Sequence, residues 1–157
     1  EKLIHQPEKH TLQAIATSHK KDIQFLFPAY YPMATQATAC YCYDLKEIAA
    51  EKIRAILTRR GTKARDYVDL YMLNQKGITI SSVKENAMTK TQFMLGYEKY
   101  AQNLSKKTFN EKIELGKEEN LLIQPIGKDF SHFAEKSQKE LSQIAQEITK
   151  KYAQTKT

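Results

Sequence analysis

The chain has few glycines, few cysteines and no long apolar run. All five glycines lie at Gly61 or later, so a glycine-rich phosphate-binding turn before that position is excluded. Cys40 and Cys42 form neither a C-x-x-C motif nor a cysteine–histidine metal pattern, and we interpret them as ordinary thiols of a reducing compartment. No apolar run approaches the roughly 20 residues of a membrane-spanning helix, and the amino terminus has no signal-peptide core. We therefore expect a cytoplasmic protein with no membrane partner.

The composition is that of a globular protein with an excess of basic residues. The 157 residues are 41% hydrophobic and 27% charged, which is enough for one domain with a real core or for two small lobes. The formal net charge of +7 favours polyanionic partners, since lysine and arginine contacts to phosphates give affinity that is independent of sequence. Charge alone is a weak indication of RNA binding.

Short strands are expected first and helices afterwards. Ile23, Phe25 and Phe27 alternate with their neighbours before Pro28, which is typical of a strand. Ala39–Tyr43 is expected to be another strand, and Thr11–Ser18 a third. The sequence thus predicts an α+β fold, mostly α, with two or three N-terminal strands followed by a helical bundle. The predicted division is residues 1–43 and a helical region at 44–157, within which 44–74 form a helix pair and 78–157 the C-terminal helices.

A capping box predicts where the first long helix begins. Asp44 followed by Glu47 has the spacing in which each side chain can bond the first-turn amides, so the helix should start at about Leu45. Its apolar residues recur every three or four positions, and at about 100° per residue Lys52 falls inside that stripe. Two interpretations stay open for Lys52. It can extend its ammonium to the rim of the core, or it can have a chemical role.

The next helix carries two carboxylates on a mostly apolar surface. It is expected to begin near Lys63, after a short basic turn that contains Gly61. Asp66 and Asp69 lie one turn apart on a face otherwise formed by leucines. Burial and mutual repulsion would both raise their pKa values, so a cation is needed: Lys52, Arg65, or a divalent metal with phosphate oxygens. An ion-pair network that pins two helices together and a catalytic site are equally consistent with this spacing.

An aromatic stripe is predicted further along the chain. Phe93, Tyr97 and Tyr100 keep helical spacing in a long helix that follows a second capping box at Ser82 and Glu85. Such a stripe is more often part of a core than a platform for stacking bases.

The residues of the helix pair carry a resemblance to a known family. The run A-E-K-I-R-A-I-L-T-R-R, followed by K-A-R-D-Y-V-D-L-Y, resembles the third and fourth motifs of the nucleotidyltransferase family named after the AbiEii and AbiGii abortive-infection toxins. The similarity runs from about Asp22 to Leu73, and its specific portion from Leu45. It implies a polymerase-β-type core followed by a helical domain. It also points to NTP and Mg²⁺ as cofactors, to tRNA or another RNA as acceptor, and to a cognate antitoxin protein as partner.

The resemblance assigns roles to four residues. It makes Lys52 a catalytic residue that contacts the nucleotide phosphates, Arg65 a second nucleotide contact, and Asp66 and Asp69 catalytic carboxylates that support the site. It assigns no metal ligand.

Two motifs of the family are not found before this region. Nothing between Glu1 and Asp44 resembles its Gly-Gly-Ser/Thr turn or its Asp-x-Asp pair. We therefore expect the carboxy-terminal part of such an enzyme, with residues 1–43 as the remnant of a nucleotidyltransferase core, and weak nucleotide binding without transfer by this chain alone. The alternative is a non-enzymatic helical module that binds RNA or protein, in which Lys52, Asp66 and Asp69 form a structural ion-pair network. An antitoxin-like regulator is a third and weaker possibility.

Overall fold

The computed structural model describes residues 3–12, 20–116, 122 and 125–155. Contacts within the chain divide it into two compact units. Unit 1 consists of Glu1–Ile4 and Leu45–Thr157, and unit 2 is His5–Asp44. None of the described helices is both long enough and apolar enough to cross a membrane.

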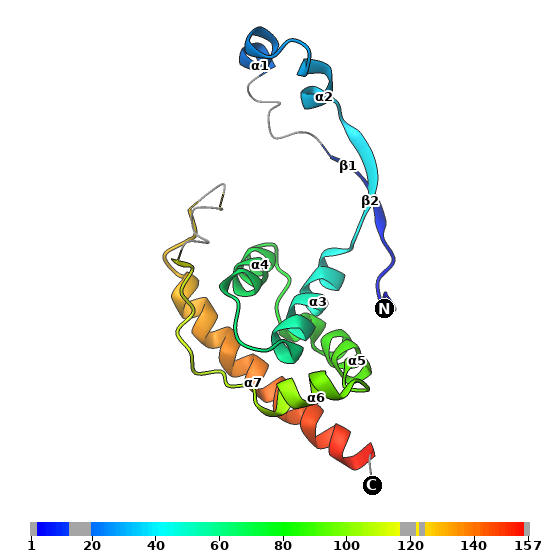
Figure 1. Ribbon diagram of the computed structural model, residues 1–157, viewed down its shortest axis with the longest axis vertical. Helices are drawn as coiled ribbons and strands as arrows, with labels where there is room; N and C mark the ends of the chain where they lie inside the picture. The colour runs from blue at the N-terminus through cyan, green and yellow to red at the C-terminus, as the bar shows by residue number, and fades with distance from the viewer. Residues whose placement is uncertain (1–2, 13–19, 117–121, 123–124, 156–157) are drawn as a thin grey trace. The chain divides into compact units, whose positions relative to one another are not determined.

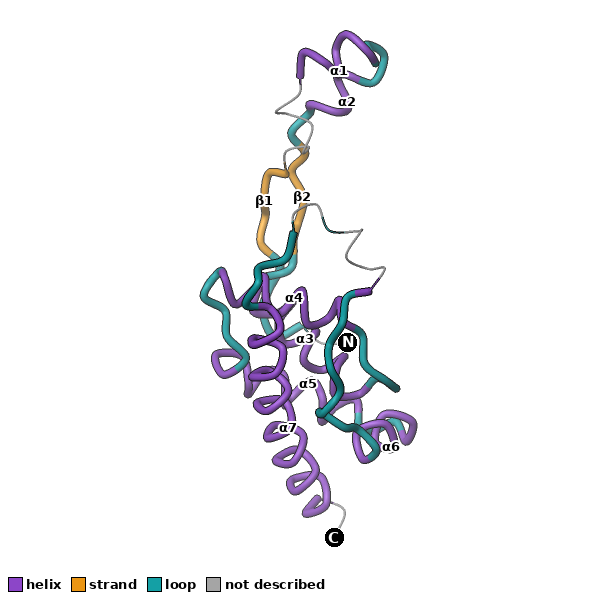
Figure 2. The backbone as a smooth tube through the Cα atoms, turned by 90° about the vertical axis from the view of Figure 1, so that its left-hand side faces the viewer, coloured by secondary structure: helices purple, strands orange, loops and turns teal. Residues whose placement is uncertain are grey.

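Unit 2 contains a β-hairpin and two short helices. The strands are antiparallel, and their register pairs Glu8 with Cys42 at one end and Leu12 with Thr38 at the other; Figure 2 shows them in orange. Between the strands lie the two helices, of whose described residues none is buried. The elements are β1 (Glu8–Leu12), α1 (Lys20–Leu26), α2 (Tyr31–Thr35) and β2 (Thr38–Cys42).

One of the predicted strands is wrong. Residues 22–26 belong to helix α1, and the amide of Phe27 still donates to the carbonyl oxygen of Ile23 at 2.8 Å. Ile23 and Phe27 are four residues apart, so the apparent alternation fits a helical turn equally well. The strand expected at Ala39–Tyr43 is present as β2, whereas most of the one expected at Thr11–Ser18 lies outside the described residues. The predicted fold class, mostly α with N-terminal strands, is confirmed.

Helix α3 is the central element of unit 1. It begins at Leu45, as the capping box predicts, and contacts α4, α5, α6 and α7. Figure 1 shows these helices around it. Its inward face includes Ala50, Ile53 and Leu57, each fully buried. The helices are α3 (Leu45–Thr58), α4 (Ala64–Gln75), α5 (Lys84–Met94), α6 (Glu98–Ser105) and α7 (Phe130–Thr155), with a 3₁₀ turn, η2 (Ser81–Val83), before α5.

The aromatic stripe predicted to be core is largely exposed. The chain leaves its helix after Met94 and starts a new one at Glu98, so the helical spacing does not continue on one face. Gly96, a poor helix former, lies in the break. Phe93 and Tyr97 are 62% and 58% exposed, whereas Leu95 between them is buried. The prediction failed for these two aromatics because the periodicity was counted across two helices. Ala101 and Leu104, which continue the predicted stripe, do pack in or against the core.

Candidate functional site

Two side chains fix the turn between α3 and α4. Asn103 belongs to α6, and Lys107 lies just after this helix. Gly61 has a φ of 71°, in the left-handed region that glycine adopts without strain. The side-chain amide of Asn103 donates from Nδ2 to the carbonyl oxygen of Thr58 at 2.8 Å. The ammonium of Lys107 donates to the carbonyl oxygens of Arg59 and Gly61. These bonds satisfy carbonyls that the end of a helix leaves without intrahelical partners, so the basic turn has a defined conformation.

Lys52 meets both predicted carboxylates across the α3–α4 interface. Its Nζ lies 2.5 Å from Oδ2 of Asp69 and 3.8 Å from Oδ1 of Asp66. The Lys52 side chain is 32% exposed, so its stem passes along the apolar stripe while its ammonium reaches the edge of the core. Asp66 is only 3% exposed, but Asp69 is 41% exposed. The structure therefore brings together three of the four residues that the sequence singles out.

Arg59, which sequence reasoning missed, is the second cation at Asp66. Its Nη1 donates to Oδ2 of Asp66, so this buried carboxylate lies between Arg59 and Lys52. Two cations compensate for the loss of water around a buried carboxylate. Arg65 does not take this place: its side chain is exposed and lines a hollow beside Arg54 and Lys99. One signal in the sequence could have identified Arg59: it is a basic residue seven positions before Asp66, on the other side of the turn at Gly61.

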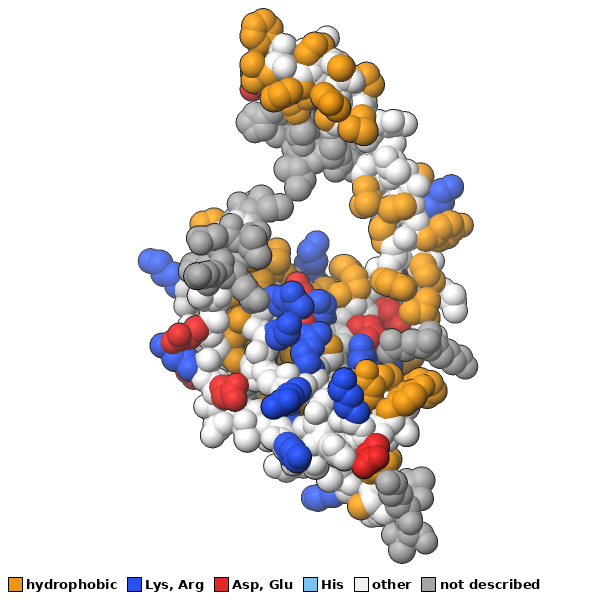
Figure 3. Space-filling view, viewed as in Figure 1, with side chains coloured by type: hydrophobic (Ala, Val, Ile, Leu, Met, Phe, Trp, Pro, Cys, Tyr) orange, Lys and Arg blue, Asp and Glu red, His pale blue; other side chains and the backbone are white. Residues whose placement is uncertain are grey.

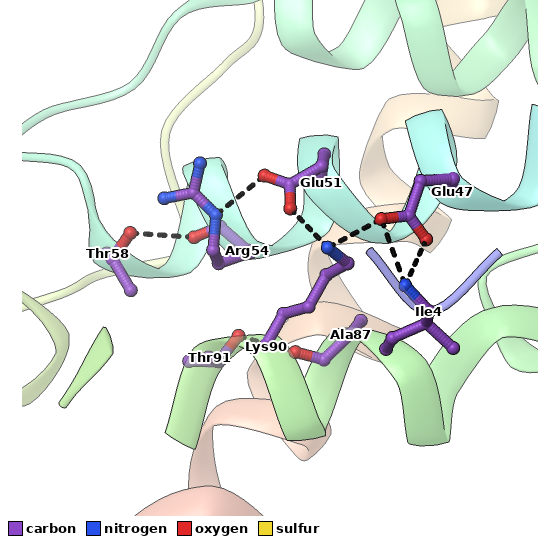
Figure 4. Close-up of polar contacts among 8 residues, drawn as sticks. All are labelled: Ile4, Glu47, Glu51, Arg54, Thr58, Ala87, Lys90 and Thr91. Atoms are coloured by element: carbon purple, nitrogen blue, oxygen red, sulfur yellow. Dashed lines mark hydrogen bonds and ion pairs between the residues drawn. The ribbon is translucent and has the colours of Figure 1, made fainter. Parts of the chain in front are cut away.

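A second charged network, also missed, lies on another side of α3. Lys90 of α5 is 3% exposed, and its Nζ lies 2.7 Å from carboxylate oxygens of both Glu47 and Glu51 (Figure 4). Glu47 is 1% exposed and accepts a hydrogen bond from the amide of Ile4 as well. Glu51 in turn holds Nε of Arg54 at 2.8 Å. Lys90 therefore ties α5 to two successive turns of α3.

The surroundings of two lysines shift their pKa values in opposite directions. Burial alone would lower the pKa of Lys90, but its hydrogen bonds with Glu47 and Glu51 outweigh this effect, and the pKa lies above its ordinary value. Burial lowers the pKa of Lys107 below the usual range, and the neighbouring Arg59 acts in the same direction. The ammonium of Lys107 therefore gives up its proton more readily than that of an exposed lysine.

Asp66 and Asp69 do not belong to a larger cluster of metal-ligating side chains among the described residues. Within the described ranges there is no group of three or more histidine, cysteine, aspartate or glutamate side chains placed to hold a metal ion. Asp66 and Asp69 both face cationic side chains instead. The site therefore combines two carboxylates with the cations Lys52 and Arg59.

Comparison with known protein families identifies the chain. The family model described as "Nucleotidyl transferase AbiEii toxin, Type IV TA system" matches residues 3–153. The chain belongs to this family. The match extends well beyond the helix pair that carries the sequence resemblance, and it includes Lys52, Arg65, Asp66 and Asp69. No curated protein and no solved structure matches the chain.

Membership in the AbiEii toxin family carries two consequences. A nucleotidyl transferase takes a nucleoside triphosphate as substrate, so the family implies NTP. A toxin of a type IV toxin–antitoxin system implies an antitoxin partner.

Proposed function

We propose that this chain is an AbiEii-type nucleotidyltransferase, or the carboxy-terminal part of one, that transfers a nucleotide from an NTP to an RNA such as tRNA, and that Lys52 binds the triphosphate. The observation that carries the proposal is the position of the Lys52 ammonium, at the edge of the core between a buried carboxylate and an exposed one. Asp69 is 41% exposed, so it can turn to water when a phosphate oxygen takes its place at Lys52. The ammonium is thus held in place before substrate arrives.

The two carboxylates have different roles in this proposal. Asp66 stays with Arg59 and keeps Lys52 directed to one side of α3. Asp69 acts as the exchangeable partner of Lys52. Arg65, exposed on the same helix α4, supplies a second cation for phosphate oxygens.

Positioned positive charge is the contribution that these residues can make to the reaction. In nucleotidyl transfer, an acceptor hydroxyl loses its proton and its oxygen forms a bond to the α-phosphorus, while the bond from that phosphorus to the bridging oxygen breaks and pyrophosphate leaves. Catalysis of phosphoryl and nucleotidyl transfer relies on positioning and on stabilising the negative charge of the phosphate oxygens. When bound with the triphosphate, Mg²⁺ would stabilise part of that negative charge. Lys52 and Arg65 would bind and orient the phosphates.

A non-enzymatic RNA- or protein-binding module is the second candidate. It is favoured by the burial of Asp66 between Arg59 and Lys52, an arrangement that also pins α3 to α4 in a purely structural way. The two candidates differ in what Lys52 does. In the module, Lys52→Met leaves nucleotide binding unchanged.

Nucleotide binding by Lys52→Met decides between them. We expect calorimetry with each of the four NTPs to show binding by the wild-type chain and a loss of at least about tenfold in affinity for Lys52→Met, as for removal of a charge-assisted phosphate contact. Lys46→Met is the matched control, because Lys46 is exposed on the same helix outside the Asp66–Asp69 cluster. In urea, Lys52→Met should lower the free energy of unfolding by no more than about 1 kcal/mol, since Asp69, the nearer of its two carboxylate partners, is exposed.

Equal NTP affinity in Lys52→Met and Lys46→Met would exclude a phosphate-binding role for Lys52 and favour the module. Transfer is read separately, as labelling of RNA from an α-³²P-labelled NTP.

A further inference from the structure

Two adjoining hollows surround the basic turn between α3 and α4. One has a volume of about 470 Å³ and the other about 560 Å³, and Arg59, Arg60 and Asn103 line both. Eight cationic side chains of the described residues line them. Arg59 pairs with Asp66 and Lys107 bonds the turn backbone. The other six we call the basic groove: Arg54, Arg60, Lys63, Arg65, Lys99 and Lys106. Figure 3 shows Lys and Arg side chains gathered on this face of unit 1.

The cations of the basic groove are poorly compensated by carboxylates. Glu111 is the one acidic side chain among the described residues that line the two hollows. Arg60, Lys63, Lys99 and Lys106 are exposed, and within the described part of the chain no carboxylate lies within 4.0 Å of their charged nitrogens. Like charges gathered in this way repel each other. Their arrangement therefore favours a ligand with several negative charges.

The groove is held in shape from beneath. Asn103 and Lys107 donate hydrogen bonds to three backbone carbonyl oxygens in and before the turn, as described above. Arg54 is positioned by Glu51, which Lys90 holds from α5 (Figure 4). A surface whose backbone and Arg54 side chain are fixed before binding loses less entropy when a ligand arrives.

An aromatic side chain lies among these cations. Tyr100 lines the smaller hollow with Lys99 and is half-buried, and its ring stands edge-on to that of the exposed Tyr97 at a centroid distance of 6.2 Å. Basic side chains that follow a phosphate backbone, combined with aromatic rings on which bases stack, are the two components of single-stranded nucleic acid binding.

We infer that the basic groove binds the phosphate backbone of an RNA single strand, with Tyr100 available to stack on a base. The groove spans two hollows and carries more positive charge than one triphosphate requires. Arg59 lines both hollows and pairs with Asp66, which pairs with Lys52. RNA in the groove thus lies beside the candidate nucleotide site. That this RNA is the acceptor of the nucleotide rests on the proposed function. The binding of RNA by the groove does not, because it requires no NTP.

The salt dependence of RNA binding tests the groove. Fluorescence anisotropy of a labelled mixed-sequence 12-nucleotide RNA is measured with the full chain at several salt concentrations. We expect the double variant Arg60→Gln/Lys63→Gln to bind more weakly and its slope of log K against log salt to fall by about 1.4, because each phosphate contact on a single strand contributes about 0.7. The loss should be similar for RNAs of different sequence.

The matched control is Lys139→Gln/Lys150→Gln. Both lysines are exposed on α7 and line neither hollow, and the net charge changes by the same amount. We expect its slope to equal that of the wild type. Lys99→Gln on α6 serves as a second groove variant, expected to lower the slope by about 0.7, should the double variant fold poorly by circular dichroism.

Three results would overturn the inference. The first is equal slopes in the groove and control variants. The second is competition by poly-glutamate as effective as that by unlabelled RNA of the same charge, which would make the groove a site for an acidic protein. The third is complete competition by ATP at equal phosphate concentration, which would make it a nucleotide site alone. Lys52→Met should bind the RNA as the wild type does, so failure of the groove and failure of the nucleotide site are separate outcomes.

Discussion

Asp66 and Asp69 lie one turn apart on α4 but differ in what their removal should cost. Asp66 is 3% exposed and faces both Arg59 and Lys52, whereas Asp69 is 41% exposed and, among the described residues, pairs only with Lys52. We expect Asp66→Ala to lower the free energy of unfolding by about 2 kcal/mol, less than for a fully buried pair because the two cations left behind can reach water. Asp69→Ala should cost less than about 1 kcal/mol.

Urea unfolding followed by circular dichroism measures both costs under the same conditions. Equal costs for the two variants would contradict the asymmetry, and would mean that the exposed pair between Lys52 and Asp69 is as important for stability as the buried one.

The residues of this cluster were only partly predictable from the sequence. Helical spacing placed Lys52 on an apolar stripe and the two aspartates on one face, which is enough to expect that they meet. Arg59 was not expected as the partner of Asp66, since its direction depends on how the chain turns at Gly61. Lys90 and Glu47 come from helices whose mutual packing no local pattern describes.

One buried lysine adds an ion-pair network to the apolar packing between α5 and α3. Lys90 is 3% exposed and Glu47 1% exposed, whereas Lys84, on the same helix α5, pairs with Glu147 at 33% and 44% exposure. Lys90→Met should cost about 3–5 kcal/mol, because it leaves a buried carboxylate without its cation. Lys84→Met, the matched control, should cost less than about 1 kcal/mol.

The two substitutions are compared by urea unfolding at pH 7. The pKa of Lys90 is raised in the folded state, so its contribution is present at neutral pH and decreases only as the pH rises above the usual value for lysine toward the raised one. The difference between the two variants should therefore shrink at strongly alkaline pH. A cost for Lys90→Met no larger than that for Lys84→Met would show that Glu47 is stabilised without this lysine.

Of the two predicted capping boxes, the first gives the observed start of its helix, but the second does not: α5 has Val83 as its N-cap residue, with no side-chain hydrogen bond at the cap. The start of α3 follows from Asp44 and Glu47, because the end of a helix is set by local hydrogen bonds. Helix α1 was predicted as a strand because Ile23 and Phe27 satisfy both periods, and no described residue of α1 is buried to decide between them. The break at Gly96 was missed because an aromatic spacing continued across it.

The two units differ in how much of their apolar surface they bury. Unit 1 contains the whole hydrophobic core of the described chain, formed around α3. Unit 2 exposes large apolar side chains instead, among them Phe25 at 84%, Tyr30 at 62% and Met33 at 71%. A segment with few buried apolar contacts opens locally at low free-energy cost. The units should therefore differ in their resistance to proteases.

Limited proteolysis with chymotrypsin tests this difference, because both units offer exposed aromatic residues. Phe27 is 57% exposed and Phe93 is 62% exposed, so access alone does not favour either. Phe93, however, lies on α5, whose turns are anchored by Met88, Lys90 and Thr91. A protease needs a locally unfolded stretch, and α5 must give up these contacts to provide one. We expect mass spectrometry of early time points to place the first cuts between Phe25 and Tyr31, with residues 45–155 surviving as one fragment; first cuts at Phe93 or Tyr97 would contradict it.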